Sequence, residues 1–236
     1  MALLNTVSNL LERIVPLRSI RTAGSKFFDK MHGLDTDGNV SLKELGLDDT
    51  DRVHYAPSSW LTIPRIAEVI TFAKDDVFID FGSGKGRQVV LAARHFAFKR
   101  VEGVELSADL NEIAAANVKR NRRNPKCKNI KLVTSDVLSY ELPHDMTIAY
   151  LYSPFTGDVF QSFIDRIGDS FSKRENKRLW IALQRPTFGL DQEELARFQQ
   201  PEDVLRSTAW LRHVDTVGFS SPNWATEISI YQCVDN

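Results

Sequence analysis

The amino-acid sequence predicts an α/β fold: a seven-stranded, mostly parallel sheet with helices on both faces, an antiparallel C-terminal hairpin and an N-terminal helical extension. Short apolar runs alternate with helical patterns between about residues 61 and 185. This alternation is typical of a parallel sheet that helices cover on both faces. The last third instead holds two strand-like patterns around the turn "GFSSPN", which predict the hairpin.

The individual elements follow from periodicity. Five short apolar runs are the expected parallel strands: Val77–Phe81, Val101–Glu105, Ile130–Thr134, Thr147–Tyr152 and Arg178–Leu183. Helices are expected at about residues 61–73, 86–95, 108–121 and 157–171, where apolar residues recur at intervals of three and four. The hairpin strands are expected at Leu205–Val217 and Ala225–Val234. We expect residues 1–60 to form the extension and residues 61–236 the main domain.

The N-terminal stretch "MALLNTVSNLLERIVPLRSIRT" predicts a helix within about residues 2–31. Its apolar residues recur at helical spacing, and the first 28 residues carry the single acid Glu12 against four basic residues. Three interpretations fit this pattern: a helix that covers the domain, a helix that rests on a membrane, and a mitochondrial transit peptide. The covering helix is favoured.

Composition excludes several classes of protein. The formal net charge is −1, so no overall field attracts nucleic acid or an anionic membrane. No run approaches the roughly 20 apolar residues that a transmembrane helix needs. Cys127 and Cys233 are the two cysteines, which is too few for a disulfide framework, so a reducing compartment and a cytoplasmic location are expected.

Two local patterns predict less than they first suggest. The stretch "KRNRRNPKCKNIK" (119–131) is basic, but a helix C-terminus followed by a solvated loop explains it, so a nucleic-acid partner is not expected. The stretch "DTDGN" (35–39) resembles the start of a calcium loop. Val40 and Gly46 then stand where such a loop needs its glycine and its carboxylate, so we expect a plain turn and no metal.

The glycine-rich loop in "VFIDFGSGKGR" (77–87) is the strongest functional signal. It follows a predicted strand and precedes a predicted helix, where ligands of open parallel sheets bind. Its glycines, Gly82, Gly84 and Gly86, have the spacing G-x-G-x-G. A dinucleotide loop would need a glycine at Arg87, and a P-loop would need Ser or Thr directly after Lys85. Both phosphate-binding interpretations therefore fail.

Acidic residues stand at the ends of three predicted strands. Asp80 comes just before the glycine loop, where a carboxylate repels a pyrophosphate but suits an ammonium or a hydroxyl. Glu105 ends the next strand, where an acid can accept both ribose hydroxyls. Asp136 follows the third strand, where it can meet an adenine edge. This set suits a cationic nucleoside with an amino-acid tail.

The chain resembles the class I S-adenosylmethionine-dependent methyltransferases in "DFGSGKGR" (80–87), "VEGVELSADLNEIA" (101–114), "TSDV" (134–137) and "YLYSPF" (150–155). The resemblance covers about residues 77–185 and implies a Rossmann-like fold, methyltransferase activity and S-adenosyl-L-methionine as the cofactor. With the lid segment described next, it implies these cofactor-binding residues: Tyr55, Ser58, Asp80, Gly82, Ser83, Gly84, Gly86, Arg87, Glu105, Asp136 and Tyr152.

A narrower resemblance lies upstream of the glycine loop. The segment "FDKMHGLDTDGNVSLKELGL...HYAPSS" is similar to a group of little-characterised bacterial methyltransferases. Its "Y.PS" motif is also similar to that of non-SET protein-lysine methyltransferases, including histone-lysine and ATP-synthase-subunit enzymes. By that likeness Tyr55, Pro57 and Ser58 would close over the methionine end of the cofactor. The alternative is a loop that ends at Pro57 and caps the following helix with Ser58 or Ser59.

The acceptor of the methyl group stays open. The related group carries "YNPF" where this chain has "YSPF", and Ser153 is shorter than the asparagine, so amine methylation is not established. The resemblance makes Ser153 and Tyr55 the catalytic candidates, and His54 and Asp136 are further candidate bases. A protein side chain is the favoured acceptor, a small metabolite is the alternative, and a non-catalytic cofactor-binding module is a third reading. The oligomeric state is not predicted.

Overall fold

A computed structural model describes residues 26–47, 51–121, 125–187, 189–221 and 224–235. The expected N-terminal helix lies mostly outside these residues, and its described end, residues 26–32, is helical. In chain order the elements are α3 (Thr62–Val69), β1 (Val77–Phe81), α4 (Arg87–His95), β2 (Arg100–Glu105), α5 (Ala108–Arg120), β3 (Ile130–Thr134), β4 (Ile148–Tyr152), α6 (Gly157–Ser172), β5 (Trp180–Pro186), α7 (Gln192–Ser207), β6 (Leu211–Ser221) and β7 (Trp224–Cys233).

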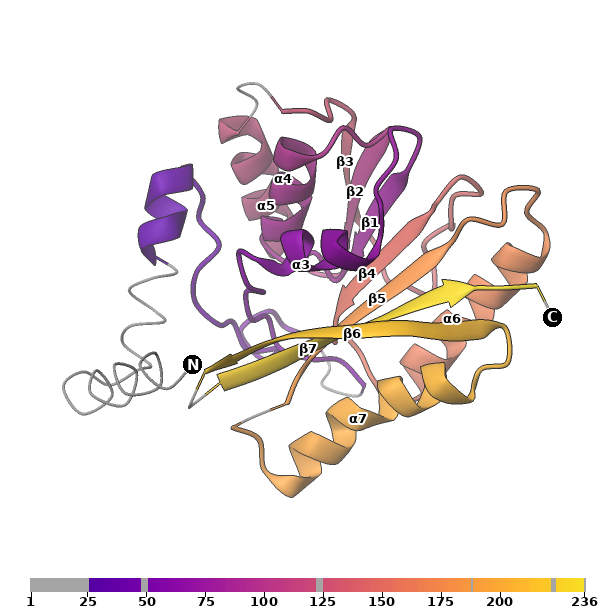
Figure 1. Ribbon diagram of the computed structural model, residues 1–236. Coiled ribbons are helices and arrows are strands. Elements are labelled where there is room, and N and C mark those ends of the chain that lie inside the picture. Colours follow the sequence, from indigo (N-terminus) through magenta and orange to yellow (C-terminus); the bar gives the residue numbers. More distant parts are fainter. Residues whose placement is uncertain (1–25, 48–50, 122–124, 188, 222–223, 236) are drawn as a thin grey trace, which may run out of the picture.

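The sheet has seven strands in the order β3-β2-β1-β4-β5-β7-β6 (Figure 1). The first five in this order pair in parallel, and β7 pairs antiparallel with both β5 and β6. The predicted fold class is therefore confirmed, including the C-terminal hairpin. Chain order reverses direction between β1 and β4, which is where open α/β sheets bind their ligands.

Two cores pack against the sheet, one on each face. Helices α3, α4 and α5 cover one face with residues such as Ile66 and Val89, and α6 and α7 cover the other with residues such as Phe163 and Leu205 (Figure 1). Strand β1 is buried along its whole length, as expected of "VFIDF", which is apolar except for Asp80. The strand thus holds Asp80 rigidly at the carboxyl edge of the sheet.

One predicted strand was wrong at its start. We expected a strand from Leu205, but residues Gln192–Ser207 form α7, and the strand begins only at Leu211. Asp191 caps α7 in a capping box with Glu194, which is a start signal that the periodicity did not reveal. The helix carries few apolar residues and has Pro201 inside it, so its pattern is weak. Helix α3 also ends earlier than expected, at Val69.

The described part of the N-terminal extension lies across the carboxyl edge of the sheet. Val40 pairs with Tyr55 in an antiparallel bridge, and Arg52 pairs with Phe155 in another. The amide of Val53 also donates to the carbonyl of Pro154. The extension therefore packs on the main domain, and the boundary at residue 60 stays a prediction. None of the helices within the described ranges is long and apolar enough to cross a membrane.

Candidate active site

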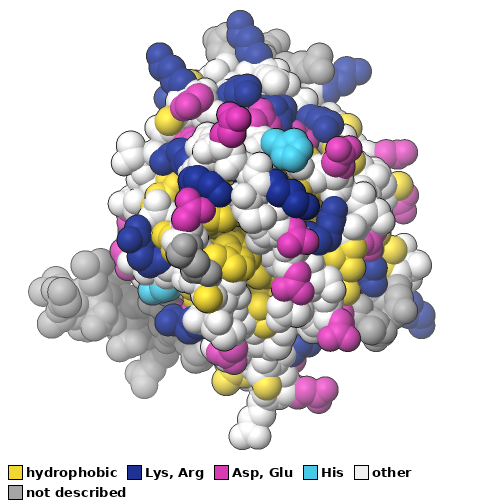
Figure 2. Space-filling view, turned by 90° about the vertical axis from the view of Figure 1, so that its right-hand side faces the viewer, with side chains coloured by type: hydrophobic (Ala, Val, Ile, Leu, Met, Phe, Trp, Pro, Cys, Tyr) yellow, Lys and Arg dark blue, Asp and Glu magenta, His cyan; other side chains and the backbone are white. Residues whose placement is uncertain are grey.

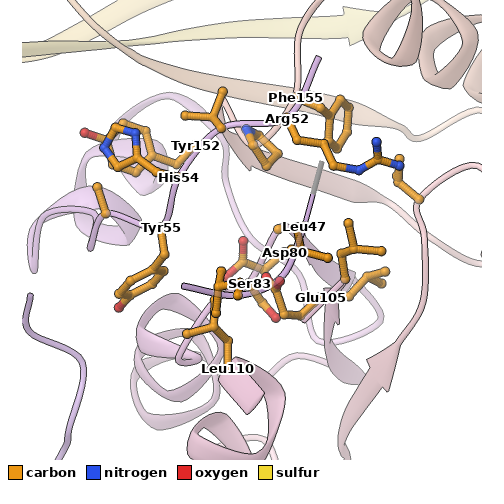
Figure 3. Close-up of a pocket in the computed structure, with 18 of the residues that line it drawn as sticks. Leu47, Arg52, His54, Tyr55, Asp80, Ser83, Glu105, Leu110, Tyr152 and Phe155 are labelled. Carbon is orange, nitrogen blue, oxygen red and sulfur yellow. The ribbon is translucent and has the colours of Figure 1, made fainter. Parts of the chain in front are cut away.

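A pocket opens at the carboxyl ends of β1, β2 and β4, beneath the N-terminal segment (Figure 3). It holds about 970 Å³ of empty space, including its open mouth. Asp80, Glu105 and Asp136 all line it. The three strand-end acids that the sequence singled out are therefore brought together around one cavity. Asp80, Ser83 and Glu105 lie on the same side of it (Figure 3).

The glycine loop is packed too tightly for any side chain. Gly82, Gly84 and Gly86 have φ angles of 77°, 53° and 79°, which are left-handed values that favour glycine. A Cβ atom at Gly82 would lie 2.3 Å from Cβ of Pro154, and one at Gly84 would lie 2.3 Å from Cε2 of Tyr55. The motifs "YSPF" and "Y.PS" therefore both contact the loop directly, the first through Pro154 at Gly82 and the second through Tyr55 at Gly84.

Asp80 and Glu105 are buried acids in a cavity. Asp80 is 3% exposed, and burial, followed by the nearby Glu105 carboxylate, raises its pKa well above the ordinary value. Burial also raises the pKa of Glu105, against hydrogen bonds from the amides of Ser107 and Gly84 at 2.9 and 2.8 Å. A buried carboxylate gains a great deal from a cationic or hydroxyl partner. The pair is suited to a ligand that supplies such donors.

Asp136 forms an ion pair with a side chain of the same protein, which the sequence did not predict. Its carboxylate lies 2.7 Å from Nη2 of Arg52, and it also accepts from the amide of Leu138 at 2.8 Å. Arg52 comes from the N-terminal segment and lines the pocket with Phe155 on the side away from Tyr55 (Figure 3). This ion pair ties the segment to the loop after β3.

The cations of the glycine loop bond to the N-terminal segment. Nζ of Lys85 donates to the carbonyl of Asp37 at 2.8 Å, and Nε of Arg87 donates to Oγ1 of Thr36 at 2.7 Å. Arg87 also donates to the carbonyl of Ser58 at 2.7 Å. These hydrogen bonds within the protein explain the two basic residues of a loop whose glycine spacing does not fit a phosphate ligand. Cofactor contact by Arg87, which borders the pocket, stays a prediction.

The "Y.PS" motif forms one wall of the pocket, which Tyr55, Pro57 and Ser58 all line. The hydroxyl of Tyr55 donates to the carbonyl of Thr36 at 2.6 Å, and burial raises the pKa of Tyr55 far above the ordinary value. Its hydroxyl points away from Asp80 and Glu105 (Figure 3). Tyr55 is thus placed as a wall and is poorly suited to take a proton. Ser58 accepts from Nε2 of Gln88 at 2.7 Å.

In the "YSPF" motif, some side chains line the pocket and others pack or bond within the domain. Tyr152 and Phe155 line the pocket, and Phe155 also packs on Phe163, with ring centroids 5.3 Å apart. Ser153 is 1% exposed, has a left-handed φ of 37°, and donates its hydroxyl to the carbonyl of Gln184 at 2.9 Å. The geometry supports a structural role for Ser153, and its catalytic role stays a prediction.

Several lining residues carried no signal that sequence reasoning recognised. Leu42, Leu45 and Leu47 line the pocket from the turn-rich segment. Their spacing in "SLKELGL" was the available signal, because apolar residues recur there in an otherwise polar stretch.

His54, a candidate base, is exposed and lines the pocket. Among the residues that the structure describes, no cluster of three or more His, Cys, Asp or Glu side chains could hold a metal ion.

Comparison with known families identifies relatives of part of the chain. The family model described as "Histone methylation protein DOT1" matches residues 55–142, which include Tyr55, the glycine loop, Glu105 and Asp136. A protein-lysine N-methyltransferase of Saccharolobus islandicus (strain REY15A) is 33% identical over 69 residues, which are 29% of this chain and 43% of that protein. The match thus spans less than half the length of this curated relative.

Comparison with solved structures agrees on the fold. An RNA methyltransferase from Salinibacter ruber in complex with S-adenosyl-L-homocysteine has a TM-score of 0.54 and 19% identity, covering 77% of this chain and 95% of that one. A geranyl diphosphate C-methyltransferase from Streptomyces coelicolor A3(2), also with S-adenosyl-L-homocysteine, has a TM-score of 0.54 and 13% identity, covering 73% and 78%. The predicted fold is therefore confirmed, and the family model together with the curated relative confirms the predicted resemblance to the class I S-adenosylmethionine-dependent methyltransferases.

Proposed function

We propose that the chain transfers a methyl group from S-adenosyl-L-methionine to an acceptor, with a protein side chain as the favoured class. The observation that carries this proposal is the pairing of Asp80 and Glu105, two buried strand-end acids, beside a glycine loop too tight for side chains. The cofactor supplies an activated methyl group on a sulfonium, which leaves the protein the tasks of binding, alignment and exclusion of water.

The residues present fit this cofactor. Asp80 has a raised pKa and, in the described part of the chain, no recorded hydrogen-bond donor, so it would gain from the ammonium of the amino-acid tail. Glu105 keeps lone pairs for ribose hydroxyls beside the amides of Gly84 and Ser107 that donate to it. The Oγ atom of Ser83 is buried without a protein partner at the same cavity. Each of these groups matches one part of the ligand.

The pocket walls would exclude water and align the acceptor. The leucines of the N-terminal segment, together with Val104 and Phe155, make part of the wall apolar. Tyr55 and Asp136 are already engaged, with Thr36 and Arg52 respectively. A mechanism that rests on alignment more than on a strong base fits this arrangement.

The preference for a protein acceptor rests on the relatives. The curated relative is a protein-lysine methyltransferase, and the family model that matches residues 55–142 is one of histone methylation. The structures of similar fold act on RNA and on geranyl diphosphate, so the fold alone does not select an acceptor. Figure 2 shows Lys and Arg side chains mixed with Asp and Glu on one face, which is unlike a nucleic-acid-binding surface.

A cytoplasmic location is proposed because Cys127 and Cys233 are both free and buried.

The test is transfer of radiolabelled methyl from S-adenosyl-L-methionine into a lysate of the source cells, separated into protein, nucleic-acid and small-molecule fractions. Asp80→Ala is the inactive variant. Asp169→Ala, an exposed change on α6, is the matched control. Label in the protein fraction that disappears with Asp80→Ala and persists with Asp169→Ala supports the proposal. Label confined to small molecules would replace the protein acceptor with a metabolite. Cofactor binding without any label would favour a non-catalytic module.

A further inference from the structure

The segment of residues 29–37, here called the bracket, is organised by a buried carboxylate. Asp29 is 6% exposed, and its Oδ2 accepts from the amides of Thr36 and Asp37, both at 2.7 Å. Its Oδ1 accepts from the hydroxyl of Thr36 at 2.6 Å. Charge-assisted bonds of this kind are about twice as strong as neutral ones. The bracket therefore has a defined backbone.

The bracket holds the glycine loop from outside the pocket. The hydroxyl of Thr36 accepts from Nε of Arg87 at 2.7 Å, while Nη2 of Arg87 lies 3.6 Å from Oδ1 of Asp29. The carbonyl of Asp37 accepts from Nζ of Lys85 at 2.8 Å. Both basic side chains that follow Gly84 therefore end on the bracket.

Helix α5 holds the bracket in place from another direction. The amide of Asp35 donates to Oδ1 of Asn117 at 2.9 Å. Nδ2 of Asn117 donates back to the carbonyl of Asp35 at 3.0 Å and to the carbonyl of Lys85 at 2.9 Å. Asn117 is fully buried, so these bonds are shielded from water. One side chain of the domain thus joins the bracket to the glycine loop.

The bracket also sets the position of Tyr55. The carbonyl of Thr36 accepts from the Tyr55 hydroxyl at 2.6 Å, while the ring lies against Gly84. Thr36 therefore bonds through its side chain to Arg87 at the end of the glycine loop, and through its backbone to the wall that packs on that loop. Thr36 itself is fully buried and is not one of the residues that line the described pocket.

We infer that Thr36 is a positioning residue for the amino-acid end of the cofactor, acting through Tyr55 and Arg87. This inference rests on the proposed function, because it takes the glycine-loop end of the pocket as the place of the amino-acid tail. Without the Thr36 hydroxyl, Asp29 loses a donor and Arg87 Nε loses an acceptor inside the protein. Such groups cost free energy when they are left unpaired. The bracket then shifts, and Tyr55 moves with it relative to Gly84.

The experiment compares two ligands by isothermal titration calorimetry. S-adenosyl-L-homocysteine carries the amino-acid tail, and 5′-methylthioadenosine has the same nucleoside without it. Thr36→Val keeps the branched shape but removes the hydroxyl, and Thr36→Ser keeps the hydroxyl as the matched control. We expect Thr36→Val to bind S-adenosyl-L-homocysteine about tenfold more weakly, because the hydrogen bonds of the hydroxyl to Asp29 and from Arg87 are lost and the bracket shifts. Binding of 5′-methylthioadenosine should stay within about twofold, because this ligand lacks the amino-acid tail that Thr36 helps to position.

The results distinguish failure of the inference about Thr36 from failure of the proposed function. Equal weakening of both ligands by Thr36→Val, or no weakening of either, overturns the positioning role. If the unchanged protein binds neither ligand, the proposed function fails and takes this inference with it. If Thr36→Val does not fold, Tyr55→Phe decides by the same comparison, because it removes only the hydroxyl that anchors the Tyr55 ring to the carbonyl of Thr36. A selective loss for the tail-bearing ligand with Tyr55→Phe supports the inference, and an unchanged ratio overturns it.

Discussion

The ring of Tyr55 lies directly on Gly84, so closely that a Cβ atom at Gly84 would come 2.3 Å from Cε2 of the ring. The two residues are far apart in sequence and belong to separate motifs, "Y.PS" and the glycine loop. Their contact explains why the second glycine must be glycine, and it makes the N-terminal segment part of the wall of the candidate pocket. Both the wall and the loop then depend on the bracket that holds them.

Gly84→Ala should weaken binding of S-adenosyl-L-homocysteine by at least about tenfold. The new methyl group must displace the Tyr55 ring, and the left-handed φ of 53° adds a cost of about 1–2 kcal/mol. Gly189→Ala is the control, because Gly189 has a φ of 79° but no atom within 4 Å of an added Cβ. Calorimetric titration of both variants is the measurement. Equal affinities in the two variants would contradict the close contact.

Asp80 should make binding of the cationic tail depend on pH. Burial and the Glu105 carboxylate raise the pKa of Asp80 well above its ordinary value, so its carboxyl group keeps its proton to a higher pH than an exposed aspartate does. An ammonium binds the ionised form, and affinity should therefore rise with pH through this raised pKa. Asp80→Asn should lower the affinity and reduce this rise. Titrations between pH 5 and pH 8, on the wild type and Asp80→Asn, test it, and identical pH slopes would count against the assignment.

The same carboxyl group should lower the stability of the free protein as pH rises. Its pKa is raised in the folded state, so its contribution is fully present below the unfolded pKa of about 4 and is lost as pH rises through the folded pKa. The raised pKa of Glu105 acts in the same direction. Urea unfolding between pH 4 and pH 8 should show a shallower decline for Asp80→Asn than for the wild type. A steeper decline in the variant would refute this origin of the pH dependence.

Ser153 should matter for stability more than for turnover. Ser153→Ala and Ser153→Gly both remove the hydrogen bond to the Gln184 carbonyl, but only glycine relieves the left-handed φ of 37°. The glycine variant should therefore be more stable than the alanine variant by about 1 kcal/mol, and both should keep their methyl-transfer rate. Thermal unfolding and turnover measure the two effects. Loss of turnover in both folded variants would instead establish Ser153 as a catalytic residue.

Strong local patterns made most of the fold predictable. The strand β1 and the helix α6 have continuous or strictly periodic apolar residues, and both were placed within one residue of their observed bounds. Helix α7 was missed because its buried face is small and includes Pro201, a residue that is unfavourable inside helices. Its capping residues, Asp191 and Glu194, lie three positions apart in a polar stretch, where charged residues are common and the signal is easily overlooked.

The candidate site was predictable where a motif carried it. Asp80 and Glu105 stand at strand ends beside the glycine loop, and parallel strands bring such residues to one edge. The ion pair of Arg52 with Asp136, and the role of Thr36, depend on contacts between residues far apart in the chain. A single sequence contains no signal for such contacts, since they arise only when the N-terminal segment folds over the sheet.

The most direct test of the central claim is a calorimetric titration of the purified chain with S-adenosyl-L-homocysteine, set beside an identical titration with a nicotinamide dinucleotide. We expect saturable binding of the first ligand at one site per chain, which Asp80→Ala abolishes or greatly weakens, and no binding of the second. Absence of binding to S-adenosyl-L-homocysteine, or tight binding of the dinucleotide in its place, would contradict the account.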